Sequence, residues 1–384
     1  MSTSTVTASD GFDPSNVDLT TADPTQIICY LSTTANEYNG KLGARISALF
    51  VILIVSTTVT FFPVVAKRIR KLHIPLYVYL FARYFGAGVI VATAFIHLLD
   101  PAYGEIGPNT CVGMTGHWAD YAWCPAIVLT SIIIIFLLDF IAERYVEIKY
   151  GIHNDPDVQQ AVTGEADTRT NGGAADAHNH APAKISSRAD VETAAAAARA
   201  FEEKFSAEGY EVDSVDEAAR DRSFKQQISA FLILEFGVMF HSVIIGLNLG
   251  VVGDEFNTLY PVIVFHQSFE GLGIGARMSA IPFKKGSWLP WFLCAGYGIT
   301  TPIAIAVGLG VRTTYNPGSF TANVVSGVLD SMSAGILIYT GLVELLARDF
   351  LFNPTRTQDN KRLTFMIVCV LLGTGIMALL GKWA

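Results

Sequence analysis

Hydrophobic residues in this chain are gathered into long runs that are nearly free of charge and are separated by polar links. A run of about twenty apolar residues is long enough to cross a bilayer as a helix. The pattern therefore predicts an all-α integral membrane protein with eight transmembrane helices. We place these helices near 45–66, 77–98, 123–145, 228–250, 258–281, 287–311, 322–346 and 363–382.

A long polar stretch divides the predicted helices into two groups. Residues 146–227 are acidic and rich in alanine, and we expect them to form a cytosolic, partly disordered loop. Three transmembrane helices within 45–145 precede this loop, and five within 228–384 follow it. Residues 1–44 are polar and are expected to form an extracellular N-terminal segment. The chain is 51% hydrophobic and only 16% charged, which also argues against a water-soluble protein.

The positions of lysine and arginine predict the orientation, because cytosolic links of membrane proteins are enriched in them. Basic residues gather in the links after the first, fifth and seventh predicted helices, whereas links 99–122 and 251–257 contain none. An even number of helices then places both termini outside the cell. The plasma membrane is the default location. The basic residues concerned are Lys67, Arg68, Arg70, Lys71, Lys284, Lys285, Arg348, Arg356, Lys361 and Arg362.

Three of the five cysteines, Cys29, Cys111 and Cys124, fall on the predicted outer side. In an oxidising compartment, Cys111 and Cys124 could pair as a disulfide. The alternative is that they are free thiols, and the sequence leaves both interpretations open.

Two predicted helices carry histidine and carboxylate side chains at mid-membrane depth, where their cost makes them functional candidates. His241 lies midway along 228–250, and His266, Gln267 and Glu270 lie midway along 258–281. His266 and Glu270 are four residues apart and therefore share one face of the helix. The two helices run in opposite directions, so at 1.5 Å per residue their polar residues meet near the membrane midplane.

Two imidazoles and a carboxylate are the usual ligands of zinc and also suit ferrous iron. The alternative is a pair of buried histidines that are hydrogen-bonded to neighbours and hold no metal. Because three ligand-type residues share one depth, we favour a metal site. Its predicted ligands are His241, His266, Gln267 and Glu270.

Further polar residues within the helices mark a candidate metal pathway. Each also has an ordinary interpretation as a helix cap, an end residue that reaches the membrane surface, or a helix–helix hydrogen bond. In the loop, two histidines with His153 either form a weak cytosolic metal site or are chance histidines. The pathway candidates are His97, Asp100, Asp139, Glu143, Asn248, Asp330 and Glu344, and the loop candidates are His178 and His180.

The stretches HSVIIGLNLG from His241 and HQSFEGLGIGAR from His266 resemble the paired signatures of the ZIP (Zrt/Irt-like) metal transporters. ATAFIHLLD in 77–98 and SAGILIYTGLVELLARDF in 322–346 support the match, which is similar to the fungal and plant zinc and iron importers. The resemblance implies an inverted repeat of the first three and last three helices around the fourth and fifth. It also implies zinc as the transported substrate and, in many members, a homodimer.

Some members of that family carry a binuclear metal centre, whose ligands match His241, Ser242, Ile245, Gln267 or its neighbour His266, and Glu270. This chain departs at Ile245, where those members have glutamate, and at Ser242, where they have asparagine. Ser242 therefore joins the pathway candidates. Since isoleucine offers no ligand atom, we expect a single metal ion at the midplane.

These observations favour a divalent metal transporter that imports Zn²⁺, with Fe²⁺ as a second substrate, into the cytosol by alternating access. One alternative is an intramembrane metalloenzyme, which would need an open water position and a general base. Another is a multi-helix membrane receptor. No HExxH motif occurs, and the loop is acidic and without an obvious docking element. We expect no enzymatic activity, no organic cofactor and no nucleic-acid partner; the bilayer and the metal ion are the expected partners.

Overall fold

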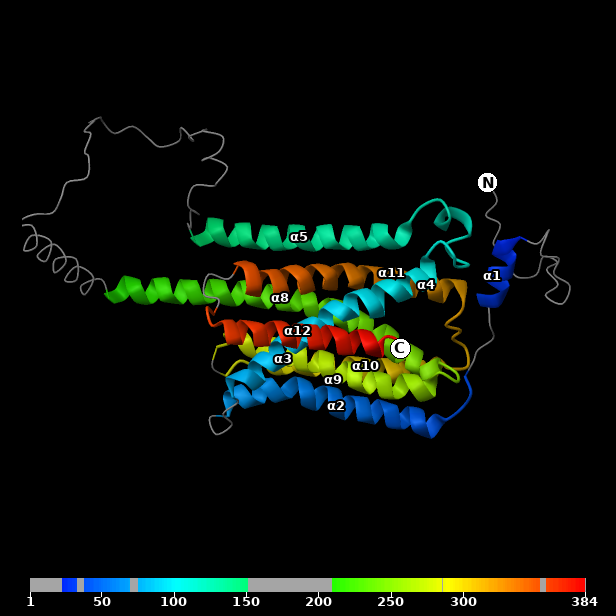
Figure 1. Ribbon diagram of the computed structural model, residues 1–384, viewed down its shortest axis with the longest axis horizontal. Coiled ribbons are helices and arrows are strands. Elements are labelled where there is room, and N and C mark those ends of the chain that lie inside the picture. Colours follow the sequence, from blue (N-terminus) through cyan, green and yellow to red (C-terminus); the bar gives the residue numbers. More distant parts are fainter. Residues whose placement is uncertain are drawn as a thin grey trace, which may run out of the picture. The chain divides into compact units, whose positions relative to one another are not determined.

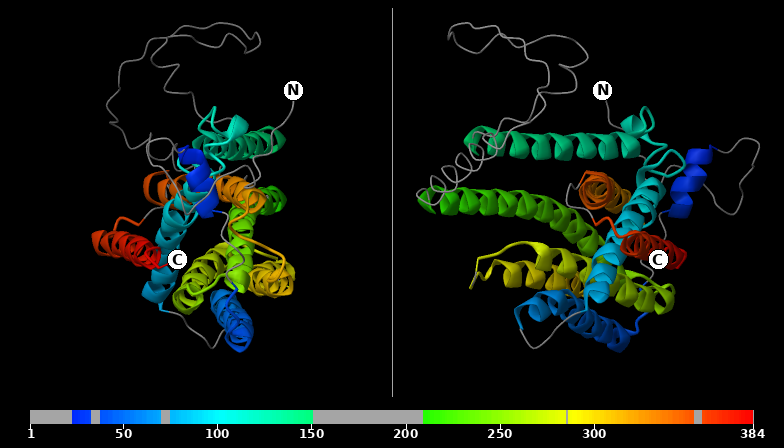
Figure 2. Two further views of the ribbon diagram at one scale, coloured as in Figure 1. Left: turned by 90° about the vertical axis from the view of Figure 1, so that its right-hand side faces the viewer. Right: turned by 60° about the vertical axis from the view of Figure 1, so that its left-hand side comes forward.

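The computed structural model describes residues 23–32, 38–69, 75–150, 209–284, 286–352 and 357–383, which form helices and connecting turns but no strand. Contacts divide the chain into two units. The larger unit, Met1–Phe140 and Gln226–Ala384, contains the helices that run side by side in Figures 1 and 2. The smaller unit, Ile141–Lys225, contains the end of α5 and the beginning of α8 within the described residues.

All eight predicted segments are helical. Two of them, the second and the seventh, change from α-helix to π-helix part-way along. A short helix α1 (Pro24–Ser32) precedes them, and η2 (Gly116–Trp118) lies in the loop after α4. The eight segments are α2 (Leu42–Arg68), α3 (Leu76–Ala92) with η1 (Thr93–Leu99) and α4 (Asp100–Ile106), α5 (Trp123–Tyr150), α8 (Gly209–Val251), α9 (Phe256–Ala280), α10 (Leu289–Val311), α11 (Phe320–Tyr339) with η3 (Thr340–Phe352), and α12 (Asn360–Leu380).

Six of these helical stretches in the described residues are long and apolar enough to cross a membrane, so the chain is a multi-pass helical membrane protein. The remaining two predicted spans, α9 and α11 with η3, carry dense sets of buried polar side chains. Helices α5 and α8 extend beyond their predicted ends, to Tyr150 and from Gly209, so the segment predicted as a loop at 146–227 is helical at both margins.

The side chains of the bundle are arranged apolar outside and polar inside. Large apolar residues such as Ile54 in α2, Leu129 in α5 and Leu371 in α12 are more than half exposed. Glu270 and Asp330, in contrast, are buried between helices. A bilayer accepts this arrangement because lipid tails solvate apolar side chains, while ionisable groups must find partners within the protein.

Two groups of helices can be distinguished by their packing. One apolar cluster joins α2, α8, α9 and α10, and a second joins α3 and α12. Glycines bring backbones together: a Cβ on Gly250 would lie 2.9 Å from Gly308, and a Cβ on Gly273 would lie 2.8 Å from the Cα of Gly86. The second contact, between α9 and α3, joins the two groups directly.

We call the end of the bundle with the α8–α9 link and the loop after α4 the outer end, and the opposite end, with the α2–α3 and α9–α10 links, the inner end. At the outer end, the buried guanidinium of Arg45 donates hydrogen bonds to the carbonyls of Leu249 (3.0 Å), Gly250 (3.3 Å) and Val252. These carbonyls belong to the last turn of α8 and to the residue after it, where a helix leaves acceptors unpaired. Arg45 therefore anchors the end of the helix that carries His241.

The Cys111–Cys124 disulfide, one of the two interpretations that the sequence left open, does not form. Cys111 pairs with Cys29 of α1, not with Cys124. Cys124 is a free thiol that is 1% exposed, and it packs against Ala102 and Ile106 of α4. The hydroxyl of Ser331 in α11 donates a hydrogen bond of 3.4 Å to the sulfur of Cys124. The bridge ties α1 to the loop after α4.

Candidate metal centre

The midplane residues of α8 and α9 come together in a buried cluster. The Nε2 atom of His266 lies 3.3 Å from Nε2 of His241 and 3.3 Å from Oε1 of Glu270. One ligand atom from each of the three residues lies within 4.8 Å of the others, and all three side chains are at most 2% exposed. The depth match predicted from the sequence therefore holds in three dimensions.

Neighbouring helices position this cluster from both sides. Thr93 of η1 donates a hydrogen bond of 3.0 Å to Oε1 of Glu270. The ring of His97 packs edge-on against that of His266, with 4.8 Å between ring centroids, and its Nε2 lies 3.2 Å from the carbonyl oxygen of Met377 in α12. The second oxygen of Glu270 is buried and has no hydrogen-bond partner among the described residues, so it is available to a cation.

Gln267 is turned toward α10. Its amide nitrogen donates to the hydroxyl of Thr301, and its amide oxygen accepts from the hydroxyl of Tyr297 at 3.2 Å. The Ser242 hydroxyl is fully buried beside His241 in sequence and has no partner within the described part of the chain. Of the four predicted ligands, His241, His266 and Glu270 therefore lie together. The fourth, Gln267, is hydrogen-bonded to α10 instead.

A cavity of about 140 Å³ reaches this cluster from the outer half of the bundle. His97, His241 and His266 line it, together with Asn248 and Asp330. Asp330 is 3% exposed, and its Oδ1 atom has no hydrogen-bond partner in the described residues. No lysine or arginine lines the cavity. Apart from these five residues and Glu105, the residues that line the cavity are apolar.

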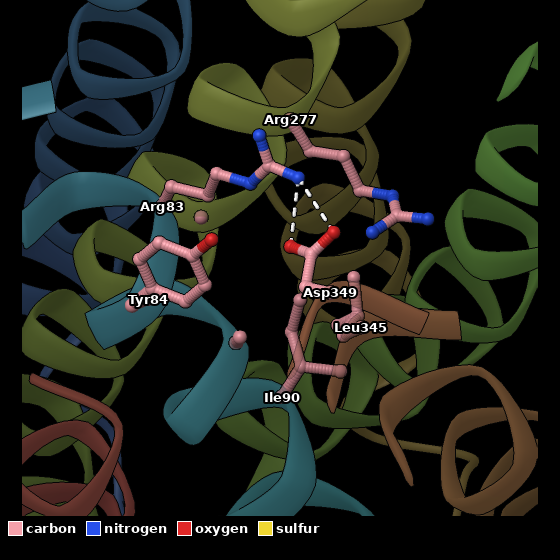
Figure 3. Close-up of a pocket in the computed structure, with 8 residues that line it drawn as sticks. Arg83, Tyr84, Ile90, Arg277, Leu345 and Asp349 are labelled. Atoms are coloured by element: carbon pink, nitrogen blue, oxygen red, sulfur yellow. Dashed lines mark hydrogen bonds and ion pairs between the residues drawn. The ribbon is translucent and has the colours of Figure 1, made fainter. Parts of the chain in front are cut away.

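The inner end is closed by ion pairs (Figure 3). One nitrogen of the Arg83 guanidinium contacts both carboxylate oxygens of Asp349, at 2.7 and 2.9 Å, and Arg277 points toward the same carboxylate. Glu344 lies 2.6 Å from Arg348 and 4.0 Å from Arg277. These contacts join α3, α9 and η3 just inward of the contact between Gly86 and Gly273.

The structure separates the remaining pathway candidates. Asp100 begins α4, is exposed and does not line the cavity. Asp139 of α5 accepts a hydrogen bond of 2.9 Å from the hydroxyl of Tyr339. Glu143 lies in α5, but its side chain is outside the described part of the structure, and the loop histidines His178 and His180 are outside the described residues as well.

Sequence reasoning missed Glu105 and the arginines at the inner end. Glu105 follows His97 by eight residues, which is just over two helical turns, but we treated it as part of a link. Arg277 follows Glu270 by seven residues and so lies on the same face of α9. Both signals were present, because a charged residue within an apolar helix is itself a functional candidate.

Two imidazoles and a carboxylate buried between helices can bind a divalent cation, and the cavity extends from them into the outer half of the bundle, while ion pairs lie at the inner end. This combination defines a membrane protein with a central metal-binding position reached through an access cavity, the architecture of a metal transporter.

The comparisons with known proteins agree with that class. The profile of the ZIP zinc transporter family matches residues 42–381, and the chain belongs to this family. It is 55% identical to zinc-regulated transporter 1 of Saccharomyces cerevisiae, over 97% of both chains. It is 43% identical to zinc-regulated transporter 1 of Schizosaccharomyces pombe, over 91% of this chain and 88% of the relative, and 31% identical to zinc transporter 9 of Oryza sativa subsp. japonica, over 93% of both. No solved structure matches the chain.

The resemblance seen in the sequence is thereby confirmed. Because the family is one of transporters, the intramembrane metalloenzyme and the receptor are set aside, and the protein is not an enzyme.

Proposed function

We propose that this protein imports Zn²⁺ into the cytosol, with Fe²⁺ as a second substrate, through the centre formed by His241, His266 and Glu270. The observation that carries the proposal is the convergence of these three ligand atoms within 4.8 Å inside a membrane-helix bundle. The family membership and the zinc transporters among its relatives support zinc as the substrate.

The spacing of the ligand atoms suits a tetrahedral ion. With metal–ligand bonds of about 2.05 Å, two ligands of a tetrahedral zinc ion lie roughly 3.3 Å apart. In this structure, Nε2 of His266 lies 3.3 Å from Nε2 of His241 and 3.3 Å from Oε1 of Glu270. The fourth ligand in this proposal is Gln267, whose amide must leave Thr301 and Tyr297 to reach the ion.

A single ion is proposed at the midplane. Two divalent ions a few ångströms apart repel strongly in a low-dielectric interior unless carboxylates bridge them. Glu270 supplies one carboxylate, but Ile245 stands one helical turn from His241, where a second would be needed. A zinc-soaked crystal should show one strong anomalous peak at this depth, and Ile245→Glu should add a second. Two full peaks in the unsubstituted protein would contradict the proposal.

Alternating access is the proposed mechanism. The cation enters the outer cavity past His97, Asn248 and Asp330, with Asp100 near its mouth, and it reaches the centre beside Ser242. One group of helices then moves against the other, so that the inner ion pairs part. The cation leaves past the inner acids. The proposed inner contacts are Asp139, Glu143 and Glu344.

The same proposal includes eight membrane spans, the inverted repeat around α8 and α9, and both termini outside the plasma membrane. Contacts at the inner end support the orientation: Lys67 donates to the carbonyl of Ser279, and Arg68 stacks on Trp291 at 4.9 Å from the ring centroid. Lys67 and Arg68 therefore lie against residues on both sides of the link between α9 and α10, and a gathering of basic residues at one end is expected on a cytosolic face. The homodimer and a weak metal site at His178 and His180 stay predictions of the sequence.

Uptake of radioactive zinc by liposomes that contain the purified protein tests the function. His241→Ala and Glu270→Ala should each reduce uptake to background, because each removes a ligand from the buried centre. His117→Ala is the matched control, since His117 lies on the outer loop, is fully exposed and is remote from the cavity lining. Normal uptake by a correctly inserted His241→Ala variant would refute the central site.

A further inference from the structure

The outer cavity holds a second set of polar side chains that the histidine cluster does not use. Glu105 of α4, Asp330 of α11 and Asn248 of α8 all line it. Asn248 follows His241 by seven residues, so it lies roughly 10 Å farther outward along α8 at 1.5 Å per residue. Three oxygen-bearing side chains from three helices thus surround the outer part of the cavity.

One oxygen of each carboxylate in this set has no hydrogen-bond partner in the described residues. Oδ1 of Asp330 and Oε2 of Glu105 are both buried, and neither accepts a hydrogen bond from the described residues. Asp330 is only 3% exposed, and it lines the cavity. Buried polar groups are normally hydrogen-bonded or bound to a cation. The unpaired oxygen of Asp330 therefore points to a ligand that occupies the cavity.

Close packing of α4 on α11 brings the two carboxylates together. Gly327 lies one turn before Asp330, and a Cβ there would stand 2.5 Å from Cγ2 of Ile106 and 3.2 Å from Cβ of Glu105. The glycine removes the side chain that would hold α4 away. Both carboxylates line the same cavity. Two like charges in a poorly solvated cavity repel, and a divalent cation between them offsets that repulsion.

We propose that Glu105 and Asp330, with the side-chain carbonyl of Asn248, form a second divalent-cation site that loads the ion before it reaches His241 and His266. The inference rests on the proposed function, since it assumes that the cavity is the route to the histidine centre. The donors are all oxygens, which hard cations such as Mn²⁺ accept and which discriminate less among metals than imidazole does. Selection for zinc then falls to the histidines farther in.

The charge balance allows both positions to be filled in turn. Two carboxylates neutralise one divalent ion, so an ion held by Glu105 and Asp330 repels a second ion at the histidine centre only weakly. The outer site thereby raises the local concentration of cation at the cavity without blocking the centre.

Mn²⁺ titration followed by electron paramagnetic resonance tests the site on the purified full-length protein in lipid nanodiscs. In a His241→Ala background, which disables the central cluster, one Mn²⁺ should bind per chain. Adding Asp330→Asn should weaken this binding about tenfold or more, equivalent to the loss of one strong ligand. Adding Glu105→Gln instead should do the same and serves if the first variant does not fold. Asp120→Asn, a substitution of an exposed acid on the outer loop, should leave the titration unchanged.

Zinc uptake provides the second measurement. Asp330→Asn and Glu105→Gln, each with His241 intact, should raise KM about tenfold while the maximal rate changes little, because they act before the central site. Identical Mn²⁺ titrations with and without Asp330, together with an unchanged KM, would overturn the proposal. If His241→Ala alone leaves uptake normal, the central-site function fails, but the Mn²⁺ titration still decides whether the outer site exists.

Discussion

Both ends of the pathway contain buried carboxylates, but these carboxylates have different partners. At the outer end, Glu105 and Asp330 line the cavity, and each has a buried oxygen without a hydrogen-bond partner in the described residues. At the inner end, Asp349 is bound by Arg83, and Glu344 is bound by Arg348. Arginines therefore lie against the inner carboxylates, although Oε1 of Glu344 also has no hydrogen-bond partner in the described residues, whereas no lysine or arginine lines the outer cavity.

This difference has consequences for a transported cation. An unpaired carboxylate in a poorly solvated cavity attracts a divalent ion strongly, whereas an arginine-paired carboxylate has little attraction left to give. The pair Arg83–Asp349 joins α3 to η3, and Arg277 lies 4.0 Å from Glu344 and so links α9 to η3; these contacts between helices hold the bundle together there. In the state described, the molecule therefore attracts cations at its outer end and keeps them from leaving at its inner end.

The difference between the two ends is tested most strongly by a substitution that makes the outer region resemble the inner one. Asp330→Lys would place a fixed positive charge in the cavity, about 6 Å from an incoming ion. At an effective dielectric of about 20 this repulsion is roughly 5 kcal/mol, so zinc uptake in liposomes should fall at least about 100-fold. Asp120→Lys, on an exposed loop, should leave uptake nearly unchanged. Uptake by Asp330→Lys at near-normal rate would show that the cavity is not the route.

The inner closure can be tested through its backbone contact. In Gly273→Ala, the new Cβ would meet the Cα of Gly86 at 2.8 Å, and neither backbone can yield without moving α3 away from α9. We expect a loss of about 3 kcal/mol in the free energy of unfolding, as for an overpacked core.

Thermal unfolding in nanodiscs measures this change. Gly375→Ala in α12 is the matched control, because a Cβ there meets nothing within 4 Å, and alanine should be neutral or slightly stabilising in a helix. Equal melting temperatures for the two variants would show that the contact between α3 and α9 is looser than the structure indicates.

The inner ion pair should have a smaller effect on stability. A double-mutant cycle of Arg83→Ala and Asp349→Ala should give a coupling energy of about 2 kcal/mol, typical of hydrogen bonds to charged groups. The Arg83 side chain is 32% exposed, which keeps the value below that of a fully buried pair. The losses in the free energy of unfolding of the two single variants should therefore sum to more than the loss of the double variant. A coupling energy near zero would mean that the pair does not hold the inner end.

The smallest effect is expected from a change that touches neither region. Deleting residues 155–185 removes part of the acidic loop and should leave the initial rate of zinc uptake within about twofold of the unchanged protein. Its effect should appear instead in the turnover of the transporter in cells exposed to zinc. Complete loss of uptake in correctly localised protein would show that the loop takes part in transport itself.

Several features could be predicted from the sequence because they depend on local pattern. The length and hydrophobicity of the runs placed all eight helical segments, and the main differences are the earlier beginning of α8 at Gly209 and the later ends of α4, η3 and α5 at Ile106, Phe352 and Tyr150. The helical repeat and the antiparallel direction of α8 and α9 placed His241, His266 and Glu270 at one depth. These quantities follow from the rise and periodicity of a single helix, and no knowledge of its neighbours is needed.

Other features were decided only by the way the helices pack. Cys29 and Cys111 are 82 residues apart and meet because α1 folds against the loop after α4. Gln267 turns to α10 because Thr301 and Tyr297 offer partners there. The π-helical turns η1 and η3, which present Thr93 and Glu344 to other helices, have no signal in the hydrophobic pattern.

The partners of the buried charges belong to this second group. Glu105 and Asp349 are both acidic residues near the ends of apolar helices, and nothing in their local sequence tells them apart. Packing leaves Oε2 of the first without a hydrogen-bond partner in the described residues and places the second against Arg83 of α3. The free energy of a charge inside a membrane protein depends on which groups surround it in space, so only the tertiary structure determines which carboxylate is left to bind a cation.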